Sequence, residues 1–131
     1  MIIHSDEEMQ DFGEKLARDC PRVIELTGDV GAGKTTLVKG LARGLGASEE
    51  VTSPSFVISK RYKIRRGELI HYDFYRLKEV GLMADEIAEA MLDPENVIVV
   101  EWGESIKDLL PDDRKKIEIR ILNENEREVL A

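Results

Sequence analysis

The sequence contains little cysteine and no long hydrophobic run. A single cysteine, Cys20, excludes an internal disulfide and any metal site built from several cysteines. No apolar stretch approaches the ~20 residues needed to cross a membrane. The acidic N-terminal residues 1–10 lack the basic-then-apolar pattern of a signal peptide. We therefore expect a cytoplasmic protein that does not associate with a membrane.

The sequence also lacks a surplus of basic charge. Its formal net charge is −8 at pH 7. This charge argues against a protein that binds nucleic acid by itself, because such proteins usually present many Lys and Arg side chains to the phosphates. The run Lys60–Arg66 is the local exception. It fits a solvated hairpin tip or, alternatively, a contact patch for RNA or an acidic partner. If the protein serves an RNA pathway, we expect a partner to hold the RNA.

The glycine-rich segment Gly28–Thr35 is the most specific motif in the chain, and it matches G-x-x-x-x-G-K-[ST] at every position. Its glycines permit positive φ angles, and its N–H groups, with those of the next helix, form an anion-binding cradle. Lys34 can neutralise charge on the outer phosphates, and the Thr35 hydroxyl can ligate Mg²⁺. A plain glycine-rich turn is the alternative, but the flanking strand and helix patterns favour a P-loop for Mg·ATP. The positions expected to contact nucleotide are Asp29, Val30, Gly31, Ala32, Gly33, Lys34, Thr35 and Thr36.

Helix and strand patterns alternate along the chain, whose 131 residues we expect to form one domain, residues 1–131. Helices are predicted at about residues 6–19, at 37–45 before Gly46, at 78–92 and, short, near 104–110. Strands are predicted at 23–26, 56–64, 68–73, 97–100, 116–122 and 128–130, with hairpins around 65–67 and 123–126. This order predicts an α/β protein of the P-loop NTPase fold, a single three-layer domain with a mixed sheet and antiparallel hairpins.

Two carboxylates follow predicted strands and are candidate partners of the loop. Glu101 follows the most apolar run, residues 97–100, and a buried strand of that kind places its end at the ligand edge of a sheet. Asp73 follows a weaker run, residues 69–72. Either acid would otherwise be an ordinary surface residue. His71 has no His or Cys companion at ligand spacing, so we expect a hydrogen-bonded strand histidine and no metal ligand.

Four blocks in order give the chain a family resemblance: Gly28–Thr36 (GDVGAGKTT), Thr52–Phe56 (TSPSF), His71–Leu77 (HYDFYRL) and Glu101–Glu104 (EWGE). The chain resembles the TsaE family, also called the YjeE family, of small P-loop ATPases. The resemblance implies slow hydrolysis of ATP with Mg²⁺. It also implies work with TsaB and TsaD, which make N6-threonylcarbamoyladenosine beside the anticodon of tRNA. The ATPase would support turnover of that assembly and would meet tRNA indirectly, through the complex.

The resemblance also implies roles for individual residues. Lys34 and the loop amides would hold the phosphates, and Thr35 and Glu101 would ligate Mg²⁺. Thr52 would lie in a switch-like loop facing the γ-phosphate, and Asp73 would assist the metal or the water, which makes Asp73, Thr52 and Glu101 the catalytic candidates. Trp102 would border the nucleotide, as would Ser5 and Asp6 before the first helix.

Three other functions are alternatives to this interpretation. A GTPase is disfavoured because the guanine-specific N-K-x-D motif is absent. A small P-loop kinase would need a lid and an acceptor pocket, for which the chain has little room. A nucleotide-gated assembly subunit with incidental hydrolysis fits almost as well as a working ATPase.

No arginine finger is evident, and Arg76 is the nearest candidate by motif.

Overall fold

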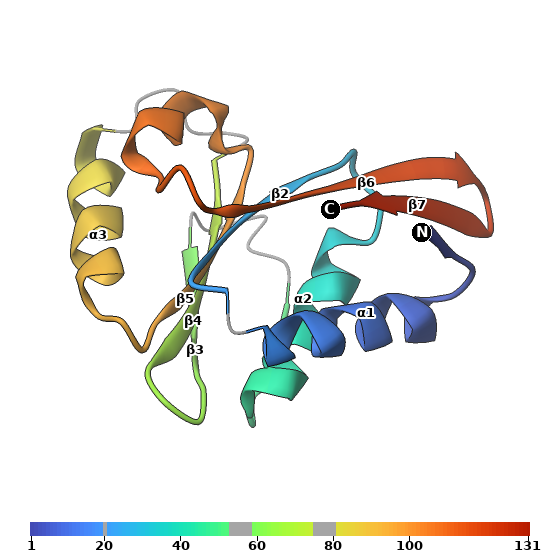
Figure 1. Ribbon diagram of the computed structural model, residues 1–131, viewed down its shortest axis with the longest axis horizontal. Coiled ribbons are helices and arrows are strands. Elements are labelled where there is room, and N and C mark those ends of the chain that lie inside the picture. The colour runs from blue at the N-terminus through green and yellow to red at the C-terminus, as the bar shows by residue number, and fades with distance from the viewer. Residues whose placement is uncertain (20, 53–58, 75–80) are drawn as a thin grey trace.

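The computed structural model describes residues 1–19, 21–52, 59–74 and 81–131. Its helices are α1 (Asp6–Arg18), α2 (Lys34–Leu45), α3 (Gly81–Leu92) and a 3₁₀ helix, η1 (Gly103–Leu109). Its strands are β1 (Ile2–Ile3), β2 (Val23–Thr27), β3 (Ser59–Lys63), β4 (Glu68–Asp73), β5 (Val97–Glu101), β6 (Lys115–Asn123) and β7 (Glu126–Leu130). Figure 1 shows their arrangement.

In the described part of the chain, seven strands form one mixed sheet in the order β1-β7-β6-β2-β5-β4-β3. The four inner strands β6, β2, β5 and β4 are parallel. The β3–β4 and β6–β7 pairs are antiparallel hairpins, and β1 pairs antiparallel with β7. The predicted mixed sheet with antiparallel hairpins is confirmed. The strand β1 was not predicted, because two residues are too few to show an alternating pattern.

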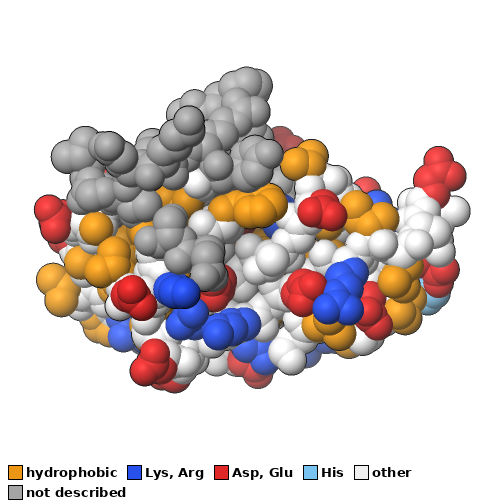
Figure 2. Space-filling view, turned by 90° about the horizontal axis from the view of Figure 1, so that it is seen from above, with side chains coloured by type: hydrophobic (Ala, Val, Ile, Leu, Met, Phe, Trp, Pro, Cys, Tyr) orange, Lys and Arg blue, Asp and Glu red, His pale blue; other side chains and the backbone are white. Residues whose placement is uncertain are grey.

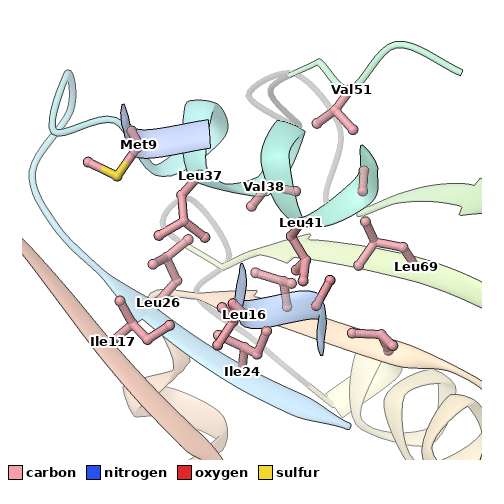
Figure 3. Packing of buried hydrophobic residues seen from close by; sticks show 14 of the residues in the cluster. Met9, Leu16, Ile24, Leu26, Leu37, Val38, Leu41, Val51, Leu69 and Ile117 are labelled. Atoms are coloured by element: carbon pink, nitrogen blue, oxygen red, sulfur yellow. The ribbon is translucent and has the colours of Figure 1, made fainter. Parts of the chain in front are cut away.

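Helices cover both faces of the sheet, as Figure 1 shows, with α1 and α2 on one side and α3 on the other. Leu37, Val38 and Leu41 of α2 are fully buried, and Figure 3 shows Leu37 pointing toward Leu26 of the sheet. A second cluster on the opposite face joins Ile87 of α3 to strand residues. The three-layer α/β architecture is therefore confirmed.

The predicted helix ends are largely correct. The Ser5 hydroxyl caps α1 by accepting from the Glu8 N–H at 3.1 Å. The Glu8 carboxylate accepts from the His4 N–H at 2.9 Å, one residue before the position that a full capping box would use. Gly46 ends α2 with a φ of 88°, a left-handed conformation that favours glycine. The short helix predicted near 104–110 is the 3₁₀ helix η1.

Charged side chains of both signs are interspersed on the face seen in Figure 2. Part of the basic run Lys60–Arg66 is engaged within the protein, since Arg61 pairs with Glu68 at 3.2 Å and with Glu86 at 3.3 Å. Among the described residues, none of the helices has the length and apolar character of a membrane span. Cys20, the single cysteine from which we predicted that no internal disulfide forms, lies outside the described residues.

Candidate active site

The segment Gly28–Thr35 forms a tight loop between β2 and α2. Gly31 and Gly33 have φ angles of 85° and 106°, so the two positions use the freedom that only glycine has. Helix α2 has no side-chain cap at Gly33 and no acidic residue in its first turn. The first N–H groups of any helix lack helical partners, and within the described part of the chain no capping side chain at Gly33 occupies them, which favours an anion there. Val30 is 85% exposed at the loop's outer surface.

Lys34 is the first residue of α2, and its ammonium group is engaged within the protein. The side chain is only 10% exposed, and its Nζ lies 3.2 Å from Glu101 Oε1. Nζ also donates to the carbonyl of Gly28 and lies 4.8 Å from the centroid of the Trp102 ring. The loop, the end of β5 and the tryptophan are thus joined through one cation, and the structure brings Lys34, Glu101 and Trp102 together.

Glu101 is a buried acid at the carboxyl end of β5. It lies opposite Leu26 of β2 and Asp73 of β4 in the parallel register. Its Oε1 faces Lys34, and its Oε2 is hydrogen-bonded to His71 Nε2. Burial by itself raises the pKa of Glu101, but the hydrogen bonds and charges of His71 and Lys34 outweigh burial, and the net pKa is lowered. The carboxylate is therefore ionised at neutral pH.

His71 is completely buried and belongs to the site through Glu101. The expectation of a hydrogen-bonded strand histidine is confirmed, but its partner was not predicted. Along β4, alternation puts Leu69, His71 and Asp73 on one face of the sheet, the face of the α1–α2 core that contains Leu69. The spacing His71-x-Asp73 was therefore a usable signal that the histidine and the acid share a face.

Asp73 is half-buried at the end of β4, directly opposite Glu101. The next N–H along the chain, that of Phe74, donates to the Glu101 carbonyl at 3.1 Å, so the ends of β4 and β5 stay paired. The two candidate acids are thus adjacent, as parallel neighbouring strands require.

Thr52 is held by β3. Its hydroxyl accepts from Lys60 Nζ at 3.0 Å, and the Tyr62 hydroxyl bridges its backbone N–H and carbonyl at 3.1 Å each. The proposed part of Thr52 toward a γ-phosphate stays a prediction. The rest of the switch-like block, residues 53–56, and the candidate finger Arg76 lie outside the described residues.

A pocket of about 250 Å³ lies on the outer side of the loop and is bordered by Ser5, Asp6 and Gly31–Gly33. The two residues predicted before the first helix therefore do adjoin the loop. The β6–β7 turn completes the pocket, and Arg127 Nη2 donates to the Gly31 carbonyl at 3.3 Å. Arg127 was not predicted to lie at the site, because nothing local to it indicates that a hairpin near the C-terminus returns to the loop.

A larger groove of about 880 Å³ is bordered by Arg22, Met91 and Arg114. It lies at the start of β2, whereas the loop follows the end of that strand. Arg114 is already paired with Glu25 at 2.9 Å, and Arg22 donates to the Met91 carbonyl at 2.7 Å. Size alone therefore does not make this groove the active site, and the convergence of charged groups around Lys34 identifies the candidate.

Comparison with known proteins agrees with this fold. The family model described as "Threonylcarbamoyl adenosine biosynthesis protein TsaE" matches residues 3–129. Two curated relatives carry the name tRNA threonylcarbamoyladenosine biosynthesis protein TsaE. The one from Streptomyces coelicolor is 42% identical over 118 residues, covering 85% of this chain and 78% of the relative. The one from Bacillus subtilis is 41% identical over 111 residues, covering 82% of this chain and 66% of the relative, just under two thirds.

A solved structure supports the same assignment. The crystal structure of YdiB from Bacillus subtilis superposes with a TM-score of 0.77 and 31% sequence identity, over 98% of this chain and 80% of that chain. The match of the family model to nearly the whole chain, the identity to curated relatives and the shared fold agree with one another. This chain belongs to the TsaE family, whose members take part in tRNA threonylcarbamoyladenosine biosynthesis.

Proposed function

We propose that this chain is a Mg²⁺-dependent ATPase that supports threonylcarbamoyladenosine modification of tRNA. The observation that carries the proposal is the contact of Lys34, from the glycine-rich loop, with Glu101, at the end of an inner parallel strand. A cation at a helix N-terminus beside a strand-end carboxylate is the arrangement by which such loops hold a triphosphate and its metal.

The loop would bind the phosphates of ATP. The positive φ angles at Gly31 and Gly33, together with the uncapped start of α2, favour an anion against the backbone. Lys34 would leave Glu101 and the Gly28 carbonyl to contact the outer phosphates. The pocket beside Ser5, Asp6 and Arg127 is continuous with the loop and is the candidate place for the nucleoside.

The Thr35 hydroxyl and Glu101 would hold Mg²⁺ together with phosphate oxygens and water. This pair fits the metal because Mg²⁺ usually keeps several waters and takes only one or two carboxylates from the protein. Among the described residues, no three His, Cys, Asp or Glu side chains gather as a metal cluster. The metal would supply charge stabilisation at the phosphates, and Asp73, beside Glu101, would orient the attacking water.

The partners TsaB and TsaD, and an indirect encounter with tRNA through them, belong to the same proposal, as does a cytoplasmic location. The net charge of −8 argues that tRNA affinity resides in the partners. We expect slow hydrolysis by the chain alone, because efficient phosphoryl transfer needs further donors at the γ-phosphate. Binding to the partners would then complete the site and accelerate hydrolysis.

The test uses Trp102, the only tryptophan, as an internal probe, since its ring lies beside Lys34. ATP is titrated with and without Mg²⁺, and phosphate release is then measured with and without TsaB and TsaD. We expect a fluorescence change that Lys34→Ala abolishes, and faster release with the partners. A folded Lys34→Ala protein with unchanged affinity and turnover would contradict the proposal. Tight tRNA binding by the chain alone would contradict the charge argument.

Two variants separate the acids. Glu101→Ala should weaken the Mg²⁺ dependence of nucleotide binding, because a metal ligand is lost. Asp73→Ala should lower turnover more than nucleotide affinity, because its expected work is at the reacting phosphate. The reverse pattern would show that the roles of the two strand ends are exchanged.

A further inference from the structure

The proposed chemistry does not use His71, although this side chain has no exposed surface and lies at the site. Its Nε2 is hydrogen-bonded to Glu101 Oε2, and its Nδ1 has no hydrogen-bond partner among the described residues. Filling a core position would call for an apolar residue, since burying an unpaired nitrogen costs free energy. A buried histidine with one nitrogen unpaired and the other on a carboxylate suggests that the contact with Glu101 is the reason for its presence.

The two oxygens of Glu101 have different partners. An ionised carboxylate can only accept, so His71 must donate through Nε2–H. Oε2 is thereby fixed from the neighbouring strand, whereas Oε1 faces Lys34 at 3.2 Å. His71 lies opposite Val99 in the parallel register, two residues before Glu101, so the histidine reaches the acid diagonally across two paired strands. A contact between paired strands of the sheet does not move when the Lys34 side chain does.

We propose that His71 is a positioning residue that presents Oε1 of Glu101 to the metal. This inference rests on the proposed function. When Lys34 turns to the phosphates, Oε1 loses its ammonium partner and becomes available, while Oε2 stays bound to His71. Without the Nε2–H donor, the carboxylate is free to rotate, and Oε1 is no longer held toward the metal. Hydrogen-bond partners of metal ligands are known to set metal affinity in this way.

The test is the ratio of ATP dissociation constants without and with Mg²⁺, measured by Trp102 fluorescence. His71→Leu keeps much of the volume but removes the donor, and we expect this ratio to fall roughly 10–100-fold while affinity without Mg²⁺ is unchanged. His71→Gln, whose amide N–H can take the place of Nε2–H, should restore most of the ratio. Tyr72→Phe is the matched control, because Tyr72 is the next residue of β4 and is also buried with an unpartnered polar atom.

A folded His71→Leu protein with the wild-type ratio would overturn the proposal. So would equal losses with and without Mg²⁺, because they indicate a purely structural role. If the wild-type chain itself shows no Mg²⁺-dependent ATP binding, the proposed function fails and this inference fails with it. The two failures are distinguishable, because a failure of the proposed function appears in the wild-type protein, whereas a failure of this inference alone appears only in the His71 variants.

A measurement that leaves His71 in place covers the case in which His71→Leu does not fold. The chain has two histidines, and His4 is exposed, so ¹⁵N NMR with a His4→Gln variant assigns the His71 ring. We expect the His71 ring to carry a proton on Nε2, and we expect the signal of that proton to be protected from exchange with solvent. A ring protonated only on Nδ1 would overturn the proposal, because a bare Nε2 cannot donate to Glu101.

Discussion

Replacing Lys34 with methionine should destabilise the empty protein as well as remove nucleotide binding. The ammonium group lies 3.2 Å from Glu101 Oε1, and at an effective dielectric constant of about 20 this attraction amounts to about 5 kcal/mol. Desolvation offsets part of it. The Glu101 side chain is 6% exposed, and breaking a buried pair typically costs about 3–5 kcal/mol because one charge is left uncompensated. His71 still holds Oε2, so we expect a loss of roughly 2–4 kcal/mol.

The assay is urea unfolding at pH 7 of four proteins: wild type, Lys34→Met, Glu101→Gln and the double variant. At about 3–5 °C per kcal/mol for a chain of this size, thermal unfolding should show a fall in Tm of roughly 6–20 °C for Lys34→Met. Adding Glu101→Gln should recover much of that loss, because the uncompensated carboxylate disappears. Arg61→Met is the control, since its ion pairs are exposed and worth less than about 1 kcal/mol.

Wild-type stability in Lys34→Met would refute the reasoning, because it would mean that the buried carboxylate needs no ammonium partner. A double variant that is no more stable than Lys34→Met would refute it as well. Losses that add, so that the double variant loses the sum of the two single losses within about 0.5 kcal/mol, would likewise refute the coupling, because that is what independent sites show.

Three further outcomes follow from the structure. Gly40→Ala should destabilise the protein by roughly 1–3 kcal/mol in urea unfolding, because the added Cβ would lie 1.9 Å from the Gln10 carbonyl oxygen where α1 and α2 cross; unchanged stability would contradict so close a contact. Arg127→Ala should weaken ATP binding about 3- to 10-fold, or roughly 0.7–1.4 kcal/mol, in the fluorescence titration, and unchanged affinity would remove Arg127 from the site. The lowered pKa of Glu101 contributes stability above the ordinary Glu pKa of about 4.3, and this contribution is lost as the pH falls through the folded value. Glu101→Gln should therefore flatten the acid side of the stability–pH profile, and an identical profile would exclude this contribution.

Features set by local interactions were predictable from the sequence. The loop Gly28–Thr35 was recognisable because its glycines, lysine and threonine all lie within one short segment. The start of α1 at Ser5 and the end of α2 at Gly46 depend on caps within a few residues, and their prediction is confirmed. Glu101 was recognisable because a wholly buried strand leaves its signature in the residues just before the acid.

Other features depend on which strands become neighbours, and that is settled by packing between residues distant in sequence. His71 and Glu101 are 30 residues apart and meet only because β4 and β5 pair in parallel with one register; a shift by one residue would put them on opposite faces. Arg127 reaches Gly31 across 96 residues because the β6–β7 hairpin joins the sheet beside β2.

The position and backbone conformation of the loop were thus predictable from the sequence, whereas the partners that hold Glu101 and complete the pocket were decided by the tertiary structure. Caps, glycine turns and hydrophobic periodicity act between near neighbours, so each can be recognised wherever it occurs in a chain. Strand order and register arise from burying both faces of the whole sheet at once. No single segment records that outcome, and the contacts that follow from it become visible only in the folded protein.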